Sequence, residues 1–507
     1  MKLLSFLPKL YFILFTLLIG IVVGIMAGNI PNLRQEEDEF LYDVFPEDFQ
    51  WGLAVSAYQT EGAFDVDGKG PSAWDAWTHE NNGSNIVDGQ NGDVACDSYN
   101  KFENDTQLLA DMGANFYKIS LSWPRIVPTG RTSDGINLAG IAHYNKVIDS
   151  LLAKNITPFV TLHQWDLPLP LVTSGSWNNE EIVKNFGDFA RIAFQFYGNR
   201  VDLWATLHEP LISCQADATF GVHDYFDEPP TKQYTCVHNV LKAHATAYKI
   251  FKDELGLSGQ VGLTLNSEWA QPKNASDPFH VDAAERLLAF RLGWFLHPIY
   301  TGDYHPIMRS IIDQKSEAEG RNSSRLPSFD DAWKQKLIGS LDFIGLNYFF
   351  TVNVVSTIGN NGGVDGDGYF ATEFDPTWNL TGDGLPITPF GMRKLLNYVK
   401  ESYGSSLPIY LINGCGEVEG VDGTDDTFRV DFFKIHINEC LKAVKLDGAN
   451  VKGFTAWSLI DNFEWSGGYT VKYGVHSVNS ANMVRTPKSS ALYLSQVISD
   501  NGFPAPK

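Results

Sequence analysis

The chain has 507 residues, of which 44% are hydrophobic and 19% charged, and it contains 13 Trp, 20 Tyr and 33 Phe. This composition is typical of a folded globular protein and excludes a largely disordered chain. The formal net charge of −22 repels nucleic acid phosphates and anionic lipids. It therefore excludes a nucleic-acid binder and favours a neutral or cationic small molecule as ligand.

The N-terminal segment predicts entry into the secretory pathway. Lys2 and Lys9 precede an uncharged apolar run, residues 10–27. A run of about 18 residues fits either a cleaved signal peptide or a signal anchor. Residues 29–44 are polar and acidic and predict a solvated linker. We expect a secreted or lumenal protein, with residues 1–28 either removed or retained as a membrane anchor.

Glycosylation tripeptides and cysteines fit the same route. The possible glycan acceptors are Asn82, Asn104, Asn155, Asn274, Asn322 and Asn379, of which Asn155 is expected to be unused because Pro158 follows its tripeptide. Five cysteines are too few for a disulfide scaffold and leave at least one free thiol. Cys214 and Cys236 are the candidate disulfide pair; the alternative is that all five are unpaired or packing residues.

Short β-rich runs alternate with helical stretches over residues 45–500. Helices are expected at 103–112 and 141–154, for example, and strands at 51–57, 116–122, 157–162, 201–206, 260–265, 341–347, 407–412 and 451–458. This alternation requires a parallel sheet. Eight strands predict one α/β domain, a single (β/α)8 TIM barrel, whose chemistry would lie at the C-terminal ends of the strands.

No pattern in the sequence predicts a metal or a cofactor. The Gly- and Asp-rich run 359–368 lacks both the Lys-Ser/Thr of a phosphate loop and the closing acid of a calcium loop. It is predicted to be a flexible surface loop. The histidines are scattered, without Cys-X-X-Cys or His-Glu-X-X-His spacing.

Glu209 is the strongest candidate for a catalytic group. It follows the fourth predicted strand and precedes Pro210, which places a carboxyl at a strand end, where a general acid is useful. His208 stands directly before it. That histidine is a possible catalytic group, and its alternative role is a structural hydrogen-bonding group.

Motifs in the same order along residues 45–500 carry a resemblance to a known family. They are Phe49-Gln-Trp-Gly-Leu-Ala-Val-Ser-Ala-Tyr-Gln59-Thr-Glu-Gly62, Ser122-Trp-Pro-Arg-Ile126, Thr206-Leu-His-Glu-Pro210, Gly293-Trp-Phe-Leu-His-Pro298, Gly302-Asp-Tyr304, Asp342-Phe-Ile-Gly-Leu-Asn-Tyr348 and Ala456-Trp-Ser-Leu-Ile-Asp-Asn-Phe-Glu-Trp465. Together they resemble the family 1 glycoside hydrolases, the retaining β-glucosidases and myrosinases. The resemblance implies the same barrel and a small glycoside as ligand.

The resemblance also implies roles for individual residues. Glu209 would be the acid/base. Gln59, Glu464 and Trp465 would bind sugar hydroxyls and stack on the ring, Trp457 would form a platform beside them, and Tyr348 would touch the nucleophile. Taken singly, each is also explained as a buried aromatic or a satisfied polar group.

The seventh predicted strand departs from the family pattern. Retaining hydrolysis needs two carboxyl groups about 5 Å apart, and the family ends this strand with Thr-Glu-Asn-Gly. This chain has Pro408-Ile-Tyr-Leu-Ile-Asn-Gly-Cys-Gly416. An ungapped alignment puts Asn413 at the nucleophile position and a shift of one residue puts Ile412 there. Neither is a carboxylate, and Glu417 is the nearest acid that a bulged loop could bring back.

Three further departures belong to the same predicted pocket. Lys118 replaces an Arg that pairs with the nucleophile, Gln164 replaces a sugar-binding His, and His208 replaces an Asn that bonds the sugar 2-hydroxyl. Loss of a carboxylate would relax the need for a bidentate guanidinium partner. The four changes indicate a shifted sugar or a different ligand.

Three functions remain open from the sequence. The first is an enzyme that uses Glu209 as a general acid on a small β-glycoside or an apolar alcohol, by altered hydrolysis or by a non-hydrolytic elimination or cyclisation. The second is a non-catalytic ligand-binding or receptor protein, as in the klotho-like members. The third is an ordinary β-glucosidase with Glu417 as a displaced nucleophile.

Overall fold

The computed structural model describes residues 39–219, 230–357, 362–418 and 423–506. The predicted signal or anchor segment lies outside these residues, as does most of the acidic linker. In the described part of the chain, no helix is long and apolar enough to cross a membrane.

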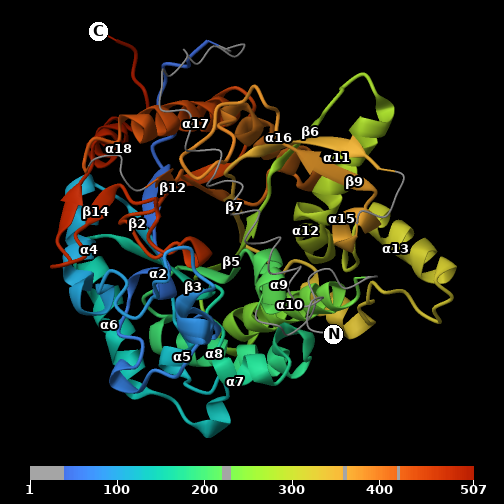
Figure 1. Cartoon of the computed structure of the whole chain (residues 1–507), viewed down its shortest axis with the longest axis horizontal. Coiled ribbons are helices and arrows are strands. Elements are labelled where there is room, and N and C mark those ends of the chain that lie inside the picture. The colour runs from blue at the N-terminus through green and yellow to red at the C-terminus, as the bar shows by residue number, and fades with distance from the viewer. Residues whose placement is uncertain (1–38, 220–229, 358–361, 419–422, 507) are drawn as a thin grey trace.

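Eight parallel strands close into a barrel, which confirms the predicted fold (Figure 1). In barrel order they pair as β1-β12-β10-β7-β5-β4-β3-β2, so the first strand closes against the last. The strands are β1 (Gln50–Ala54), β2 (Phe116–Ser120), β3 (Thr157–His163), β4 (Leu203–His208), β5 (Gln260–Asn266), β7 (Phe343–Asn347), β10 (Ile409–Asn413) and β12 (Val451–Trp457).

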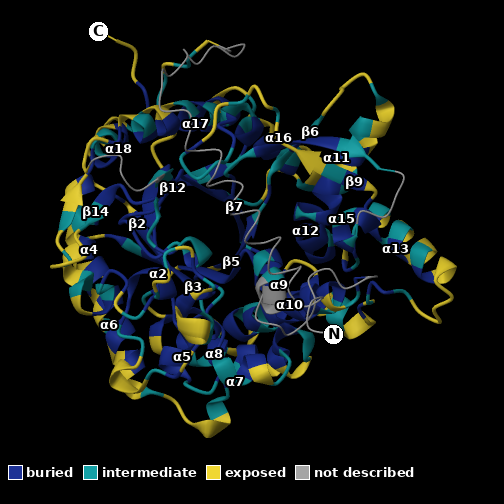
Figure 2. Ribbon diagram, in the orientation of Figure 1, coloured by how far each residue is buried: buried dark blue, intermediate teal, exposed yellow. Residues whose placement is uncertain are grey.

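Helices surround the barrel and turn their buried faces to it, with exposed residues concentrated on the outside (Figure 2). The helices of the main ring are α4 (Ser98–Met112), α6 (Leu138–Ala153), α8 (Glu181–Tyr197), α10 (Lys232–Lys249), α12 (Leu292–Thr301), α16 (Pro389–Tyr403) and α17 (Thr427–Lys445). Shorter or additional helices are α2 (Ala57–Thr60), α3 (Ala73–His79), α5 (Trp123–Ile126), α7 (Leu169–Thr173), α9 (Pro210–Thr219), α11 (Pro278–Phe290), α13 (Pro306–Ala318), α14 (Asp331–Leu337), α15 (Gly363–Asp367) and α18 (Ser489–Asp500).

Three small sheets lie outside the barrel among the residues that the structure describes. They pair β6 (Trp269–Pro272), β8 (Thr351–Ser356) and β9 (Phe370–Glu373), then β11 (Glu417–Val418) with β13 (Val471–Lys472), and β14 (His476–Val478) with β15 (Arg485–Pro487).

Aromatic rings fill the barrel interior. The cluster consists of Phe116, Phe159, Leu203, Ala205, Phe343 and Tyr410. Gly52 makes room for it, because a Cβ at that position would lie 2.4 Å from the Phe116 ring. The barrel is therefore a packed core rather than a pore, as expected for this architecture.

The two ends of the described chain lie side by side. Val44 forms an antiparallel bridge with Gly502, and the Phe503 amide donates to the Asp43 carbonyl at 2.9 Å. The Leu41 amide donates to Asn438 on α17 at 3.1 Å. The last residues of the predicted linker are thus packed on the barrel.

Two local predictions have clear outcomes. Cys214 and Cys236 form a disulfide, as predicted, and Cys96, Cys415 and Cys440 are buried free thiols. The prediction of a flexible surface loop was wrong for residues 363–367, which form α15. Its Asp367 is buried and accepts hydrogen bonds from the Arg325 guanidinium, at 3.0 Å for one of them, so an ion pair orders this segment.

Candidate active site

Glu209 lies at the C-terminal end of β4, where its backbone departs from the strand. Its φ is 46°, a left-handed conformation that is strained for a residue with a Cβ. Its amide donates to the Thr264 carbonyl of β5 at 2.8 Å, and the pairing of β4 with β5 is irregular between Ala205 and His208. The side chain is 8% exposed. The strand end thus holds an acid at the barrel mouth.

A chain of contacts crosses the barrel from Lys118 on β2 to Glu209. The Lys118 Nζ lies 3.0 Å from His208 Nδ1, and His208 Nε2 lies 3.1 Å from the Asn347 amide nitrogen. The same nitrogen donates to Glu209 Oε1 at 2.6 Å. All four residues are buried. Two predicted departures from the family pattern, Lys118 and His208, therefore meet each other beside the predicted acid.

Burial shifts the pKa values of the titratable residues in this series of contacts. It raises the pKa of Glu209 to about 7, against the Asn347 hydrogen bond and the Lys118 charge, which lower it. Burial lowers the pKa of Lys118 to about 7, while Glu209 raises it. Burial and the Lys118 charge hold the pKa of His208 well below its usual range. Glu209 therefore keeps its proton up to about pH 7, as a general acid requires.

Asn413 ends β10 as a fully buried amide. Its Nδ2 donates to the Tyr348 carbonyl, one residue beyond the neighbouring strand β7, at 2.8 Å, and its Oδ1 has no hydrogen-bond partner among the described residues. Ile412 packs with Ala54, Trp457 and Tyr473. Both possible alignments of the seventh predicted strand thus place a neutral side chain at this strand end.

Glu417 is held away from the strand end by a separate ion pair. It lies in β11, which pairs with β13, and its Oε2 is 3.0 Å from Nη2 of the buried Arg429. Burial raises the Glu417 pKa, while Arg429 lowers it. The loop that would return this carboxylate to the barrel is instead paired with another segment.

Tyr348 contacts Asn413 through its backbone, while its hydroxyl is bound elsewhere. Its hydroxyl donates to the Thr388 carbonyl at 2.5 Å and lies 2.9 Å from Thr351 Oγ1, so it is engaged on the side of α16. Its backbone carbonyl accepts a hydrogen bond from Asn413. The next residue, Phe349, packs against the cluster that contains Ile412 and Trp457.

Gln59 and Glu464 form a polar pair next to the barrel mouth. The Gln59 amide donates to Glu464 Oε2 at 3.1 Å and to Asn462 Oδ1 at 3.0 Å, and Ser56 donates to Gln59 Oε1 at 2.7 Å. Burial, and then the neighbouring Asp383, raise the pKa of Glu464 to about 8. These two predicted ligand-binding residues are therefore fixed in one hydrogen-bonded unit.

Aromatic rings line this end of the barrel. The Trp465 ring lies 4.6 Å from that of Trp165 and 4.8 Å from that of Trp74, measured between centroids. The His208 ring is 6.4 Å from Trp165 and 6.5 Å from Trp457. The predicted Trp457 and Trp465 thus lie on the same side of the barrel as His208, with flat apolar surface between them.

Gln164 is buried at the end of β3 with its Oε1 unpaired among the described residues. The indole nitrogen of Trp165 and Asn347 Oδ1 are likewise buried without a hydrogen-bond partner there. Buried polar groups are normally paired. Unpaired donors and acceptors at a barrel mouth indicate groups that bind a ligand or water.

Sequence reasoning missed three residues of this site. Asn347 contacts both His208 and Glu209, and its place at the end of β7 was the signal that could have found it. Tyr473 packs on Trp457 and donates its hydroxyl to Asp383. Tyr473 and Asp383 lie in loops outside the barrel strands, so no strand end marks them in the sequence.

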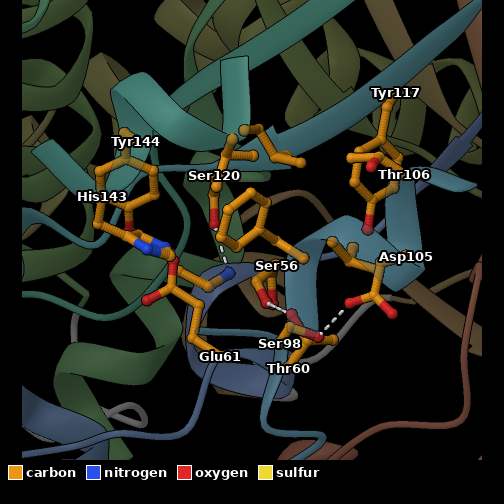
Figure 3. A pocket seen from close by; sticks show the side chains of 15 residues that line it. Ser56, Thr60, Glu61, Ser98, Asp105, Thr106, Tyr117, Ser120, His143 and Tyr144 are labelled. Carbon is orange, nitrogen blue, oxygen red and sulfur yellow. Dashed lines mark hydrogen bonds between the residues drawn. The ribbon is translucent and has the colours of Figure 1, made fainter. Parts of the chain in front are cut away.

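A separate cavity of about 40 Å³ lies beside α2 and β2 (Figure 3). Some of its polar groups are paired with one another: Ser98 donates to Asp105 at 2.7 Å and Tyr144 donates to Glu61 at 2.5 Å. No predicted site residue lines it. Within the described ranges, no group of three or more His, Cys, Asp or Glu is arranged to hold a metal ion.

Known proteins are similar to this chain in sequence and in fold. The family model described as glycosyl hydrolase family 1 matches residues 41–503. The lactase-like protein of Homo sapiens is 42% identical over 485 residues, which cover 93% of this chain and 85% of that protein. Myrosinase 1 of Brevicoryne brassicae is 36% identical and covers 90% of this chain and 98% of that protein. The solved aphid myrosinase has a TM-score of 0.84 at 35% identity, with 90% of this chain and 99% of that chain covered.

Proposed function

The chain belongs to glycosyl hydrolase family 1, and from this premise we propose that it acts on a small β-glycoside or an apolar alcohol through Glu209 as a general acid. The observation that carries the proposal is the burial of Glu209, which raises its pKa to about 7. A carboxyl that keeps its proton near neutral pH can donate it to a leaving oxygen, an effect worth typically about 10² to 10⁴-fold.

We further propose that the usual retaining hydrolysis is lost. A covalent glycosyl intermediate needs a second carboxylate about 5 Å from the acid. At the end of β10 the chain offers the neutral Asn413 or Ile412, and Glu417 is paired with Arg429. Water, a group of the substrate or an added anion would then attack. The same acid without a nucleophile also supports elimination or cyclisation of an apolar alcohol.

A hydroxyl-rich ligand matches the polar groups of the barrel mouth. Gln164 Oε1 and Asn413 Oδ1 are acceptors without a partner among the described residues, and a sugar hydroxyl would satisfy either of them. The rings of Trp457 and Trp465 offer the flat apolar surface on which a sugar face or an apolar ligand packs. Gln59 and Glu464, which are hydrogen-bonded to each other, are proposed to bind sugar hydroxyls at the same end of the barrel.

The proposal places the protein in the secretory pathway, secreted or anchored with a lumenal barrel. The disulfide between Cys214 and Cys236 supports an oxidising compartment. The apolar residues 10–27 support the same route.

One observation favours a second function, ligand binding without catalysis. Asn413 donates a hydrogen bond to the Tyr348 carbonyl. This bond gives Asn413 a structural role at the strand end, where a retaining enzyme would need a nucleophile. The same barrel would then serve as a binding or receptor protein.

The test is release of p-nitrophenol from an aryl β-glucoside by the purified protein, with and without azide. An aryl leaving group needs little acid assistance, so the assay reports on the nucleophile position. We expect the wild type to be nearly inert, and azide or Asn413→Glu to produce turnover. Asn413→Gln is the matched control, because it adds the same length without a charge.

Two results would contradict parts of the proposal. Efficient hydrolysis by the wild type without azide, unchanged in Asn413→Glu, would show that another carboxylate attacks. If azide and Asn413→Glu give no turnover while binding of the glucoside is measurable by calorimetry, the barrel binds the sugar without hydrolysing it and the binding function holds. Glu209→Gln then tests the acid itself, with an expected loss of about 10²-fold or more on substrates with poor leaving groups.

A further inference from the structure

The contacts between Lys118 and Glu209 restrict which protons the two residues can carry together. Three contacts join them: Lys118 Nζ to His208 Nδ1 at 3.0 Å, His208 Nε2 to Asn347 Nδ2 at 3.1 Å, and Asn347 Nδ2 to Glu209 Oε1 at 2.6 Å. The Asn347 Oδ1 is buried and has no partner among the described residues. One amide group thus mediates between the histidine and the acid.

With Asn347 Nδ2 facing both neighbours, the protons are fixed by counting donors. The amide nitrogen donates one hydrogen to Glu209 Oε1 and the other to His208 Nε2, which must therefore be the unprotonated ring nitrogen. His208 then carries its proton on Nδ1 and donates it to Lys118. Lys118 can accept only as a neutral amine.

The opposite orientation of the amide fits the same positions, because the nitrogen and oxygen of Asn are nearly identical in size. Asn347 Oδ1 then accepts from His208 Nε2–H and from a protonated Glu209. His208 Nδ1 becomes an acceptor and takes a hydrogen from the ammonium of Lys118. In this arrangement Lys118 is charged and Glu209 is neutral.

A charged Lys118 beside an ionised Glu209 satisfies neither arrangement. The ammonium forces the proton of a neutral His208 onto Nε2, and Asn347 must then turn its oxygen to the histidine. That oxygen would meet Glu209 Oε1, acceptor against acceptor, at the 2.6 Å of this contact. A doubly protonated His208 does not relieve the conflict, because burial and Lys118 oppose it.

We propose that His208 and Asn347 couple Lys118 to Glu209, so that a charged Lys118 keeps the proton on Glu209. Lys118 is then a positioning residue for the general acid, which it never touches. The inference rests on the proposed acid role of Glu209 and deepens it. It also explains why Lys118 and His208 occur together: both are needed, with Asn347, to connect Lys118 to Glu209 through hydrogen bonds.

The coupling opposes the direct electrostatic effect of Lys118. A nearby cation by itself favours the carboxylate and lowers the Glu209 pKa. Two other titratable groups interact with Lys118 or Glu209. They are His208 on β4, whose pKa Lys118 lowers, and Glu464 after β12, whose pKa the negative charge of Glu209 raises. Thr264 on β5 contributes a backbone carbonyl to the Glu209 amide. The two effects of Lys118 therefore have opposite signs and can be separated by experiment.

The test measures the pKa of Glu209 by NMR in the free protein, with glutamate carboxyls labelled with carbon-13 and the Glu209 signal identified by its loss in Glu209→Gln. In Lys118→Met, a change of similar length, the coupling predicts a fall of about one to two pH units, the value of one charge-assisted hydrogen bond. Electrostatics alone predicts a rise. A rise would overturn the proposal.

His208→Phe provides the matched control, because it removes this hydrogen-bonded connection and leaves both end groups. In that background Lys118→Met should raise the Glu209 pKa, so the sign of the effect reverses. The same fall in both backgrounds would overturn the proposal.

A measurement on the wild type covers the case in which a variant fails to fold. With lysine labelled with nitrogen-15, the signal that titrates differently in Glu209→Gln reports on Lys118. The coupling requires Lys118 to lose its charge at the same pH as Glu209 or below it. A Lys118 that stays charged while Glu209 ionises would overturn the proposal. Since none of these measurements needs turnover, a protein without glycosidase activity still gives a result, and missing turnover counts only against the proposed function.

Discussion

Replacing Glu209 with Gln should change how the stability of the protein depends on pH. Burial raises the pKa of this carboxyl from 4.5 to about 7 in the folded state. A group with a raised folded pKa contributes its stability below the unfolded value of 4.5, and that contribution is lost as the pH rises toward 7. Gln has nearly the same shape, can still accept from Asn347 and has no proton to lose. The variant should therefore not lose stability as the pH rises toward 7, whereas the wild type should.

The size of the effect follows from the two pKa values. Each tenfold difference in proton affinity corresponds to 1.36 kcal/mol, so the full penalty on the wild type is about 3 kcal/mol above neutral pH. Glu209 is 8% exposed, so solvent screening reduces this little. Between pH 5 and pH 8, the free energy of unfolding of Glu209→Gln should rise relative to the wild type by about 2 to 3 kcal/mol.

Denaturant unfolding of both proteins at pH 5 and at pH 8, followed by tryptophan fluorescence, measures this difference. Glu181→Gln on the exposed side of α8 is the control, and it should follow the wild type at both pH values. Parallel pH profiles for wild type and Glu209→Gln would refute the reasoning, because they would mean that Glu209 ionises in the folded protein as easily as in the unfolded chain.

Two further changes test other parts of the structure. Glu417→Gln should leave the low turnover of the aryl glucoside unchanged and lower stability by about 1.5 to 3 kcal/mol, because Arg429 keeps Asp426 as a partner but loses the charged 3.0 Å contact to Glu417. A wild type that hydrolyses the glucoside and loses this activity in Glu417→Gln would identify Glu417 as the nucleophile. Gly52→Ala should cost about 1 to 3 kcal/mol, since the new methyl would lie 2.4 Å from the Phe116 ring. Its control is Gly467→Ala, where the nearest atoms are 3.9 Å away, and equal melting temperatures for the two variants would contradict the packing argument.

The sequence was sufficient for the barrel because strands and helices alternate with clear periods. Each of the eight expected strands overlaps an observed one, but the boundaries differ. The fourth was expected at 201–206 and runs from Leu203 to His208. The irregular pairing near Ala205 depends on the neighbouring strand, which local patterns do not contain. The ordering of residues 363–367 was missed for a similar reason: the Arg325 that binds Asp367 is 42 residues away.

The candidate site was predictable at the level of strand ends but not of contacts. Glu209 and Asn413 could be placed because barrel strands present their last residues to one mouth. That Lys118 meets His208, and that Asn347 bridges His208 to Glu209, depends on rotamers and on the register of separate strands. The resemblance gave the position of Tyr348 but not the partner of its hydroxyl, which is the Thr388 carbonyl.

The pairing of β1 with β12 has a consequence for biosynthesis. The first strand is complete at Ala54, whereas its partner ends at Trp457, so the ring cannot close until nearly the whole polypeptide has left the ribosome. At typical synthesis rates this leaves an open sheet edge for roughly 20 to 80 seconds. Unpaired edges recruit other chains. Nascent molecules of this protein therefore expose a pairing edge to other chains until the last strand arrives.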